Sequence, residues 1–128
     1  MKRKGFSVVE VLIALAIFSI AILGIGATVV YNIKFAKINK LRERALYKAD
    51  KLLNYLTSLP YDSSCLTVGI RNCQTDAGTC CNGFAGDPEI SYSVENLETD
   101  IKKISVTVKF KSGDYEGGVS LEQIKGNW

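Results

Sequence analysis

Residues 2–18 read KRKGFSVVEVLIALAIF, and this stretch decides the architecture of the chain. Three basic residues and Gly5 lead into an apolar run, which Glu10 interrupts almost as soon as it begins. No further charge occurs from residue 11 to residue 33, about 23 residues that would span a bilayer core as a slightly tilted helix. A carboxylate near the bilayer centre costs roughly 2.5–3.5 kcal/mol on insertion scales. Glu10 therefore requires a partner or a role that offsets this cost.

An ordinary secretory signal, or an uncleaved signal anchor, is one interpretation of this stretch. A basic region precedes the apolar run, and Ala14-Leu15-Ala16 superficially matches a small-x-small cleavage site. That tripeptide lies inside the apolar run, however, and the apolar core of a secretory signal does not normally carry a glutamate. In an uncleaved anchor the cost of Glu10 would have no compensation.

The order of these residues also resembles a known signal. Gly5-Phe6-Ser7-Val8-Val9-Glu10, after a basic leader and before a long apolar helix, is similar to the class III signal of type IV pilins and pseudopilins. The resemblance implies cleavage between Gly5 and Phe6 by a prepilin peptidase on the cytoplasmic face, followed by N-methylation of Phe6. In that family the glutamate of an incoming subunit pairs with the N-terminal amine of a neighbour. Because an unpaired charge in a low-dielectric surround costs several kcal/mol, Glu10 would set the register of assembly.

The function implied by the resemblance is that of a minor pilin, a structural subunit of a type IV pilus. Its partners would be other pilin or pseudopilin subunits, the prepilin peptidase, the inner-membrane assembly platform and, before assembly, the membrane. The N-terminus would lie in the cytoplasm and the head outside, later within an extracellular or periplasmic filament. The alternatives are a minor pseudopilin of a type II secretion or DNA-uptake pseudopilus, and a non-filament single-pass protein with a disulfide-bonded binding head.

Composition argues against catalysis and against nucleic-acid binding. The 128 residues include 16 basic and 13 acidic ones, and three of the basic residues are Lys2, Arg3 and Lys4, which leaves 13 to balance the 13 acids. The surplus lies in the leader, so nucleic-acid binding has no strong support, and the Lys102-Lys103 pair is interpreted as a solvated strand edge. Histidine is absent, which excludes Ser-His-Asp and Cys-His nucleophiles and His-ligated metals. We expect neither an enzyme nor a cofactor.

After residue 33 the helical pattern continues, but the helix changes from apolar nearly all round to amphipathic. Apolar residues recur at spacings of three and four and form one stripe: Leu41, Ala45, Ala49, Leu52, Leu53 and Leu56. Pro60 predicts a helix end near Ser58. The sequence thus predicts a leader at 1–5, a membrane-spanning or filament-core helix at 6–33, an amphipathic rear half at 34–59 and a head at 60–128.

Two glycines interrupt the apolar helix. Gly24 and Gly26 each cost roughly 1 kcal/mol relative to alanine in a helix interior, so this region is predicted to be the weakest part of the helix. Many pilins carry a proline nearby and lose helical order there on assembly, whereas this chain has Ala27 and no proline in the span. Close helix packing at the two glycines is an equally good interpretation.

All four cysteines lie in a turn-rich segment at residues 62–88: Cys65, Cys73, Cys80 and Cys81. Outside the cytoplasm, where the class III signal would place them, an even number of cysteines indicates disulfides. A bond between adjacent Cys80 and Cys81 would be strained, so Cys65 and Cys73 are each expected to bond one of that pair, in either order. A zinc site and free thiols are the rivals, and the spacing, without Cys-x-x-Cys pairs, disfavours zinc.

The rest of the chain alternates between apolar and polar residues. Ile90, Tyr92 and Val94 predict one short strand, Ile104, Val106, Val108 and Phe110 a second, and Val119, Leu121 and Ile124 a third, with a turn at residues 111–114. The predicted fold is therefore α+β. A long helix, membrane-spanning in its first half and amphipathic in its second, packs on a small three-stranded antiparallel sheet.

Overall fold

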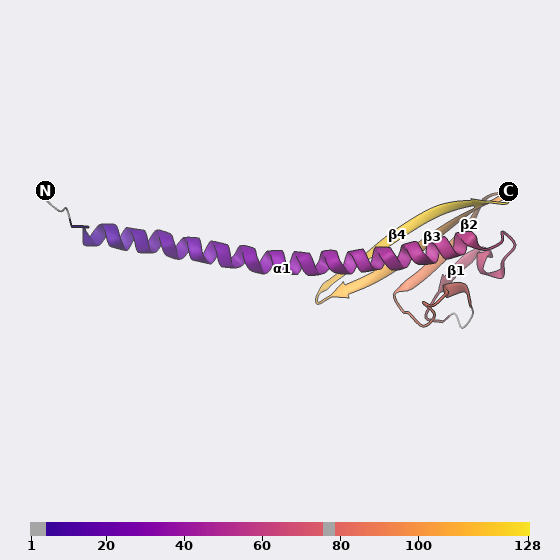
Figure 1. Cartoon of the computed structure of the whole chain (residues 1–128), viewed down its shortest axis with the longest axis horizontal. Coiled ribbons are helices and arrows are strands. Elements are labelled where there is room, and N and C mark those ends of the chain that lie inside the picture. The colour runs from indigo at the N-terminus through magenta and orange to yellow at the C-terminus, as the bar shows by residue number, and fades with distance from the viewer. Residues whose placement is uncertain (1–4, 76–78) are drawn as a thin grey trace. The chain divides into compact units, whose positions relative to one another are not determined.

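A computed structural model describes residues 5–75 and 79–128 of the chain. In chain order it contains α1 (Val8–Ser58), the short helix η1 (Ser64–Leu66), β1 (Gly69–Asn72), the short helix η2 (Thr79–Cys81), β2 (Ile90–Glu98), β3 (Ile101–Ser112) and β4 (Tyr115–Gly126) (Figure 1). The chain divides into two compact units, Met1–Lys37 and Ile38–Trp128. The long helix and the antiparallel sheet confirm the predicted α+β class.

The first unit consists of the apolar part of α1 and the residues before it. The helix begins at Val8, slightly later than the start near Phe6 that the sequence predicted. The carbonyl of Ser7 accepts hydrogen bonds from the backbone N–H groups of Glu10 at 2.9 Å and Val11 at 3.2 Å, which closes the first turn. Glu10 is thus in the first turn of α1, where the positive end of the helix dipole lowers the cost of a carboxylate.

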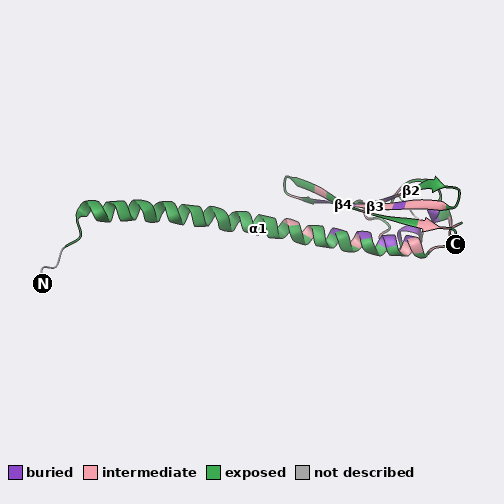
Figure 2. Ribbon diagram, turned by 90° about the horizontal axis from the view of Figure 1, so that it is seen from above, coloured by how far each residue is buried: buried purple, intermediate pink, exposed green. Residues whose placement is uncertain are grey.

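Every residue from 5 to 37 is exposed, although most are apolar (Figure 2). By length and composition this part of α1 can cross a membrane. Two of its hydroxyl groups are satisfied inside the helix: Ser19 Oγ donates to Leu15 O at 2.8 Å, and Thr28 Oγ1 donates to Gly24 O at 2.9 Å. Because these hydroxyls need no water, they are compatible with a lipid or protein surround.

The rear of α1 belongs to the second unit and has one buried side (Figure 2). The predicted stripe is confirmed, since Leu41 is half-buried and the other five members are buried: Ala45, Ala49, Leu52, Leu53 and Leu56. The helix ends at Ser58, as Pro60 predicted.

The sheet has four strands in the order β1-β2-β3-β4, all antiparallel, so the prediction of three strands was wrong by one. The missed strand, β1, is only four residues long and pairs with β2 from Gly69↔Val94 to Asn72↔Ser91. None of its residues is buried, so it lacks the apolar alternation by which a strand is recognised. The segment at residues 62–88 is therefore not all loop.

One face of the sheet forms the core of the head with the rear of α1. The buried residues of β2 and β3 alternate along the chain as predicted, whereas in β4 Val119 is buried, Leu121 is half-buried and Ile124 is exposed. The buried strand residues join the helix stripe in a single cluster: Ile90, Tyr92, Val94, Ile104, Val106, Val108, Phe110 and Val119. The Tyr92 hydroxyl donates to Cys65 O at 3.0 Å, so its polar end is satisfied inside the core.

The strands are longer than their apolar cores predicted. β3 and β4 pair along their whole length, from Ile101↔Gly126 to Ser112↔Tyr115, around the two-residue turn Gly113-Asp114. Gly113 has φ +61°, a conformation that suits glycine at the first central position of a two-residue hairpin turn. This position agrees with the turn predicted at residues 111–114.

Candidate functional site

The candidate site lies at the start of α1, around Glu10. Its side chain is exposed and forms no ion pair within residues 5–75 and 79–128. It is the one charged residue in the apolar part of the helix, since the next is Lys34. A carboxylate in this position needs a cation from outside these residues once water is removed.

The surroundings of Glu10 form an open trough of about 570 Å³ on one side of the helix. Three of its six lining residues, Glu10, Ala14 and Phe18, follow one another at intervals of four within α1 and therefore share a helix side, while Phe6 precedes the helix. The complete lining is Phe6, Glu10, Val11, Ala14, Leu15 and Phe18. The trough thus combines a single carboxylate with apolar and aromatic walls, which suits a ligand that carries a positive charge on an apolar body.

The predicted cleavage site precedes the helix. Gly5, Phe6 and Ser7 are outside regular secondary structure, and no atom lies within 4 Å of the position that a Cβ would occupy on Gly5. Packing in this fold therefore does not demand glycine at residue 5, and cleavage between Gly5 and Phe6 stays a prediction. The basic leader residues Lys2, Arg3 and Lys4 lie outside the described residues.

The two glycines in the apolar run are helical and exposed. A Cβ on Gly24 or Gly26 would meet nothing within 4 Å. Within this single chain neither glycine is required for packing. The weak point of the helix and the close helix packing predicted at these glycines both concern an assembled state, and both stay predictions.

The cysteines of the head form two disulfides, Cys65–Cys80 and Cys73–Cys81. This agrees with the disulfide interpretation, and it chooses one of the two pairings that the sequence left open. All four side chains are buried and belong to the core cluster. The described residues contain no group of three or more histidine, cysteine, aspartate or glutamate side chains that could hold a metal ion.

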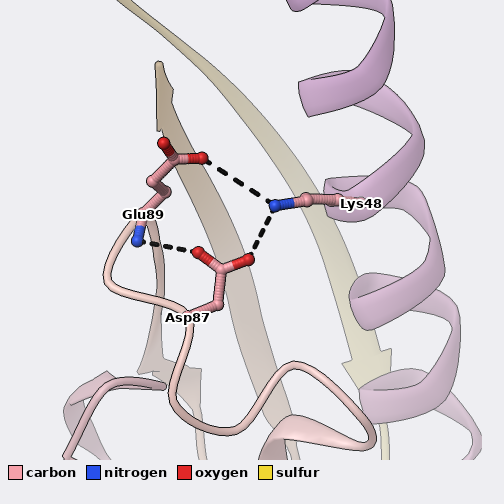
Figure 3. A network of polar contacts seen from close by, with 3 residues as sticks. All are labelled: Lys48, Asp87 and Glu89. Atoms are coloured by element: carbon pink, nitrogen blue, oxygen red, sulfur yellow. Dashed lines mark hydrogen bonds and ion pairs between the residues drawn. The ribbon is translucent and has the colours of Figure 1, made fainter. Parts of the chain in front are cut away.

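The loop that carries Cys80 and Cys81 is attached to the rear of α1 by a polar network (Figure 3). Lys48 Nζ lies 2.7 Å from Asp87 Oδ2 and 3.8 Å from Glu89 Oε2, and the Glu89 N–H donates to Asp87 Oδ1 at 3.0 Å. Burial raises the pKa of Asp87, but the hydrogen bonds from Lys48 and from the Glu89 backbone, with the charge of Lys48, lower the pKa overall.

Sequence reasoning missed this network because its residues are far apart in the chain. Lys48 and Asp87 are separated by 39 positions, and nothing in their local sequence indicates that they meet. The contacts of Arg71 were missed although they are local: its Nη2 donates to Ser64 O at 2.7 Å and to Thr67 Oγ1 at 2.6 Å, and these partners lie in the short segment between α1 and β1.

The Lys102-Lys103 pair is not at a strand edge, since β3 lies between β2 and β4. Lys102 Nζ donates to Tyr61 O at 3.0 Å and lies 4.1 Å from the centre of the Tyr61 ring. Lys103 Nζ lies 3.8 Å from Glu95 Oε2 and 3.6 Å from Glu122 Oε1. Both ammonium groups therefore have partners within the head, which weakens a role in binding phosphates.

Comparison with known proteins gives one result, at the N-terminus. Residues 1–26 match the model of a family described as the prokaryotic N-terminal methylation motif. The matched residues include the predicted cleavage site, Glu10 and the whole trough. No curated protein and no solved structure matches the chain.

Proposed function

We propose that this chain is a minor pilin that a prepilin peptidase processes, because its residues 1–26 match the prokaryotic N-terminal methylation motif. The motif points to a structural protein that is first anchored in a membrane and later assembled with other pilin subunits. In the proposed subunit, residues 1–5 are the leader, 6–33 the membrane or filament-core helix, 34–59 the rear half of the helix and 60–128 the head. The choice of a minor rather than a major subunit rests on the resemblance of the short head and of the apolar helix sequence to low-abundance subunits.

The processing step is proposed to free the amine of Phe6, which is then methylated. An α-amino group is mostly protonated at neutral pH, so each processed subunit presents a cation close to its own Glu10 and to the helices of its neighbours. Before assembly the subunit is proposed to lie in the inner membrane with its N-terminus in the cytoplasm and its head outside. An inner-membrane assembly platform would then pass it into the filament.

The observation that carries the proposal is the exposed carboxylate of Glu10 in an apolar helix, which forms no ion pair among residues 5–75 and 79–128. In an incoming subunit it is proposed to pair with the Phe6 amine of a subunit already in the filament. Leaving one member of a buried pair without its partner costs about 3–5 kcal/mol. A subunit is therefore held at the level where both charges are satisfied, and Glu10 acts as the device that sets the register.

Substitution of Glu10 tests this role in cells that make the filament. Glu10→Gln keeps the size of the side chain and removes its charge, so the variant should enter the membrane and be processed but fail to join the filament. We expect incorporation to fall about 100-fold or more, as a cost of 3 kcal/mol implies. Filaments sheared from the cells and the membrane fraction are compared by immunoblot.

Glu98→Gln is the matched control, because Glu98 is an exposed glutamate at the end of β2 in the head. It should be incorporated like the wild type. Normal incorporation of Glu10→Gln would remove the charge of Glu10 from the mechanism. The same fractions also identify the filament: recovery with a surface pilus supports the pilin proposal, whereas recovery only with a secretion or DNA-uptake pseudopilus would replace it by a pseudopilin.

A further inference from the structure

One residue that lines the trough beside Glu10 is much smaller than its neighbours. Glu10, Ala14 and Phe18 follow one another at intervals of one helical turn on the same side of α1. Phe18 is large and 64% exposed, and Phe6, at the other end of the trough, is 80% exposed. Ala14 lies between these two rings, with only a methyl group beside the carboxylate.

A larger side chain at residue 14 would obstruct the approach to Glu10. In an α-helix the Cα–Cβ bonds point toward the N-terminus, so a long side chain covers the turn that precedes its own Cα. For residue 14 that turn carries Glu10. A leucine at this position would therefore extend over the carboxylate and occupy part of the trough.

The chemistry of the trough indicates what approaches. One carboxylate is surrounded by Phe6, Val11, Leu15 and Phe18, so the complementary group is a cation attached to an apolar or aromatic residue. The processed N-terminus of a neighbouring subunit has this chemistry, because it joins an ammonium to a phenylalanine side chain. Charge complementarity in a surround without water therefore favours this occupant over a lipid chain, which would leave the carboxylate unpaired.

We propose that Ala14 is a positioning residue, which keeps open the path by which the N-terminal phenylalanine of a neighbouring subunit reaches Glu10. This inference rests on the proposed function and adds to it a steric requirement on the acceptor helix. The Glu10 charge selects the partner, and the small side chain at residue 14 lets that partner come within hydrogen-bonding distance.

The chain offers a matched control two residues away. Ala16 has the same side chain and is exposed on the same helix, but it does not line the trough. At 3.6 residues per turn, residues 14 and 16 point about 160° apart around the helix axis. Leucine at either position is a good helix former and favours membrane insertion, so both variants should insert like the wild type.

The test compares Ala14→Leu with Ala16→Leu in the full chain, in cells that assemble the filament. Mass spectrometry measures the processed N-terminal peptide in the filament and membrane fractions, and incorporation is the ratio of the two amounts. Because only processed molecules are counted, an effect of the substitution on the peptidase does not change this ratio. Ala14→Leu should lower incorporation about tenfold or more, equivalent to about 1.4 kcal/mol. Ala16→Leu should stay within about twofold of the wild type, as substitutions outside contact regions do.

Ala14→Ser serves as a second variant, because it keeps residue 14 small, and it should be incorporated within about twofold of the wild type. Normal incorporation of Ala14→Leu, an equal loss in Ala14→Leu and Ala16→Leu, or a loss in Ala14→Ser would each overturn the inference. Glu10→Gln in the same assay distinguishes a failure of this inference from a failure of the proposed function. If Glu10→Gln fails to assemble while Ala14→Leu assembles, only this inference is lost; if Glu10→Gln assembles, the proposed function is lost.

Discussion

Glu10 and Lys48 are charged residues of the same helix with opposite relations to the fold. Lys48 is neutralised within the head, where its ammonium lies 2.7 Å from Asp87 and 3.8 Å from Glu89. Glu10 has no such counterpart in the described part of the chain. A charge with a partner inside the fold stabilises that fold, whereas a charge that must leave water without one indicates a partner from outside. This difference supports assigning Glu10 to assembly and Lys48 to the stability of the head.

The lowered pKa of Asp87 makes the contribution of this network depend on pH. A carboxyl whose folded pKa is below its unfolded value of about 3.9 stabilises the fold above that value and loses the contribution as pH falls through the folded pKa. Asp87→Asn should therefore be less stable than the wild type at pH 7, by about 1 kcal/mol for a partly exposed pair. The difference should shrink below about pH 3–4. Urea unfolding of the detergent-solubilised chain at pH 7 and pH 3 measures it.

An exposed ion pair of the head provides the control. Lys111 and Glu116 lie 3.2 Å apart with side chains 67% and 74% exposed, so Glu116→Gln should leave the unfolding midpoint unchanged at both pH values. A stability difference for Asp87→Asn that is the same at pH 7 and pH 3 would contradict the assignment of this pH dependence to Asp87.

At the scale of elements, the sequence predicted those parts whose apolar spacing is regular. The rear stripe of α1 and the strand from Ile104 to Phe110 were recognised because both bury one side against the same core. β1 was missed because its four residues are all at least partly exposed and it is a strand only through its pairing with β2. The cysteine pairing could not be deduced either, since it depends on how the loop folds back and not on local spacing.

The loop between α1 and β2 depends on its two disulfides, because η1, β1 and η2 are each only three or four residues long. The bonds join residues 15 and 8 positions apart, and closing loops of this size stabilises a fold by about 2–4 kcal/mol in the chain-entropy account. The double variants Cys65→Ser/Cys80→Ser and Cys73→Ser/Cys81→Ser should each lose about this much free energy of unfolding. Urea unfolding of the oxidised proteins gives the comparison.

The wild type under reducing conditions serves as the reference. Because both bonds open there, its free energy of unfolding should fall by more than that of either oxidised double variant. Equal urea midpoints for the oxidised and the reduced wild type would show that the bonds do not stabilise the head.

At the scale of the whole molecule, the two units require different surroundings. Residues 5–37 expose an apolar surface on all sides and contribute nothing to the buried core, whereas the second unit has a complete core of its own. A helix that is apolar all round needs lipid or other helices around it, so the first unit has to be covered by one of these. Removal of residues 1–5 would also remove the three leader charges, and the 13 remaining basic side chains would balance the 13 acidic ones.

The candidate site was predictable from the sequence in its chemistry but not in its shape. Gly5, Phe6 and Glu10 were chosen from the order of residues in the sequence; they lie within the matched residues 1–26, and their roles stay predictions. Ala14 drew attention only as part of a rival cleavage site, because its contribution is the space it leaves between Phe6 and Phe18. Such a space is a property of the folded helix and has no sequence signature.

The N-terminus of the mature protein tests the central claim most directly. Mass spectrometry of the N-terminal peptide, from chain purified out of membranes and filaments, should find Phe6 as the first residue and one methyl group on its amine. The peptide from a Gly5→Leu variant should instead retain the leader, since we expect the peptidase and not the fold to require glycine there. A mature wild-type chain that begins at Met1, or at residue 17 after cleavage behind Ala16, would contradict the account.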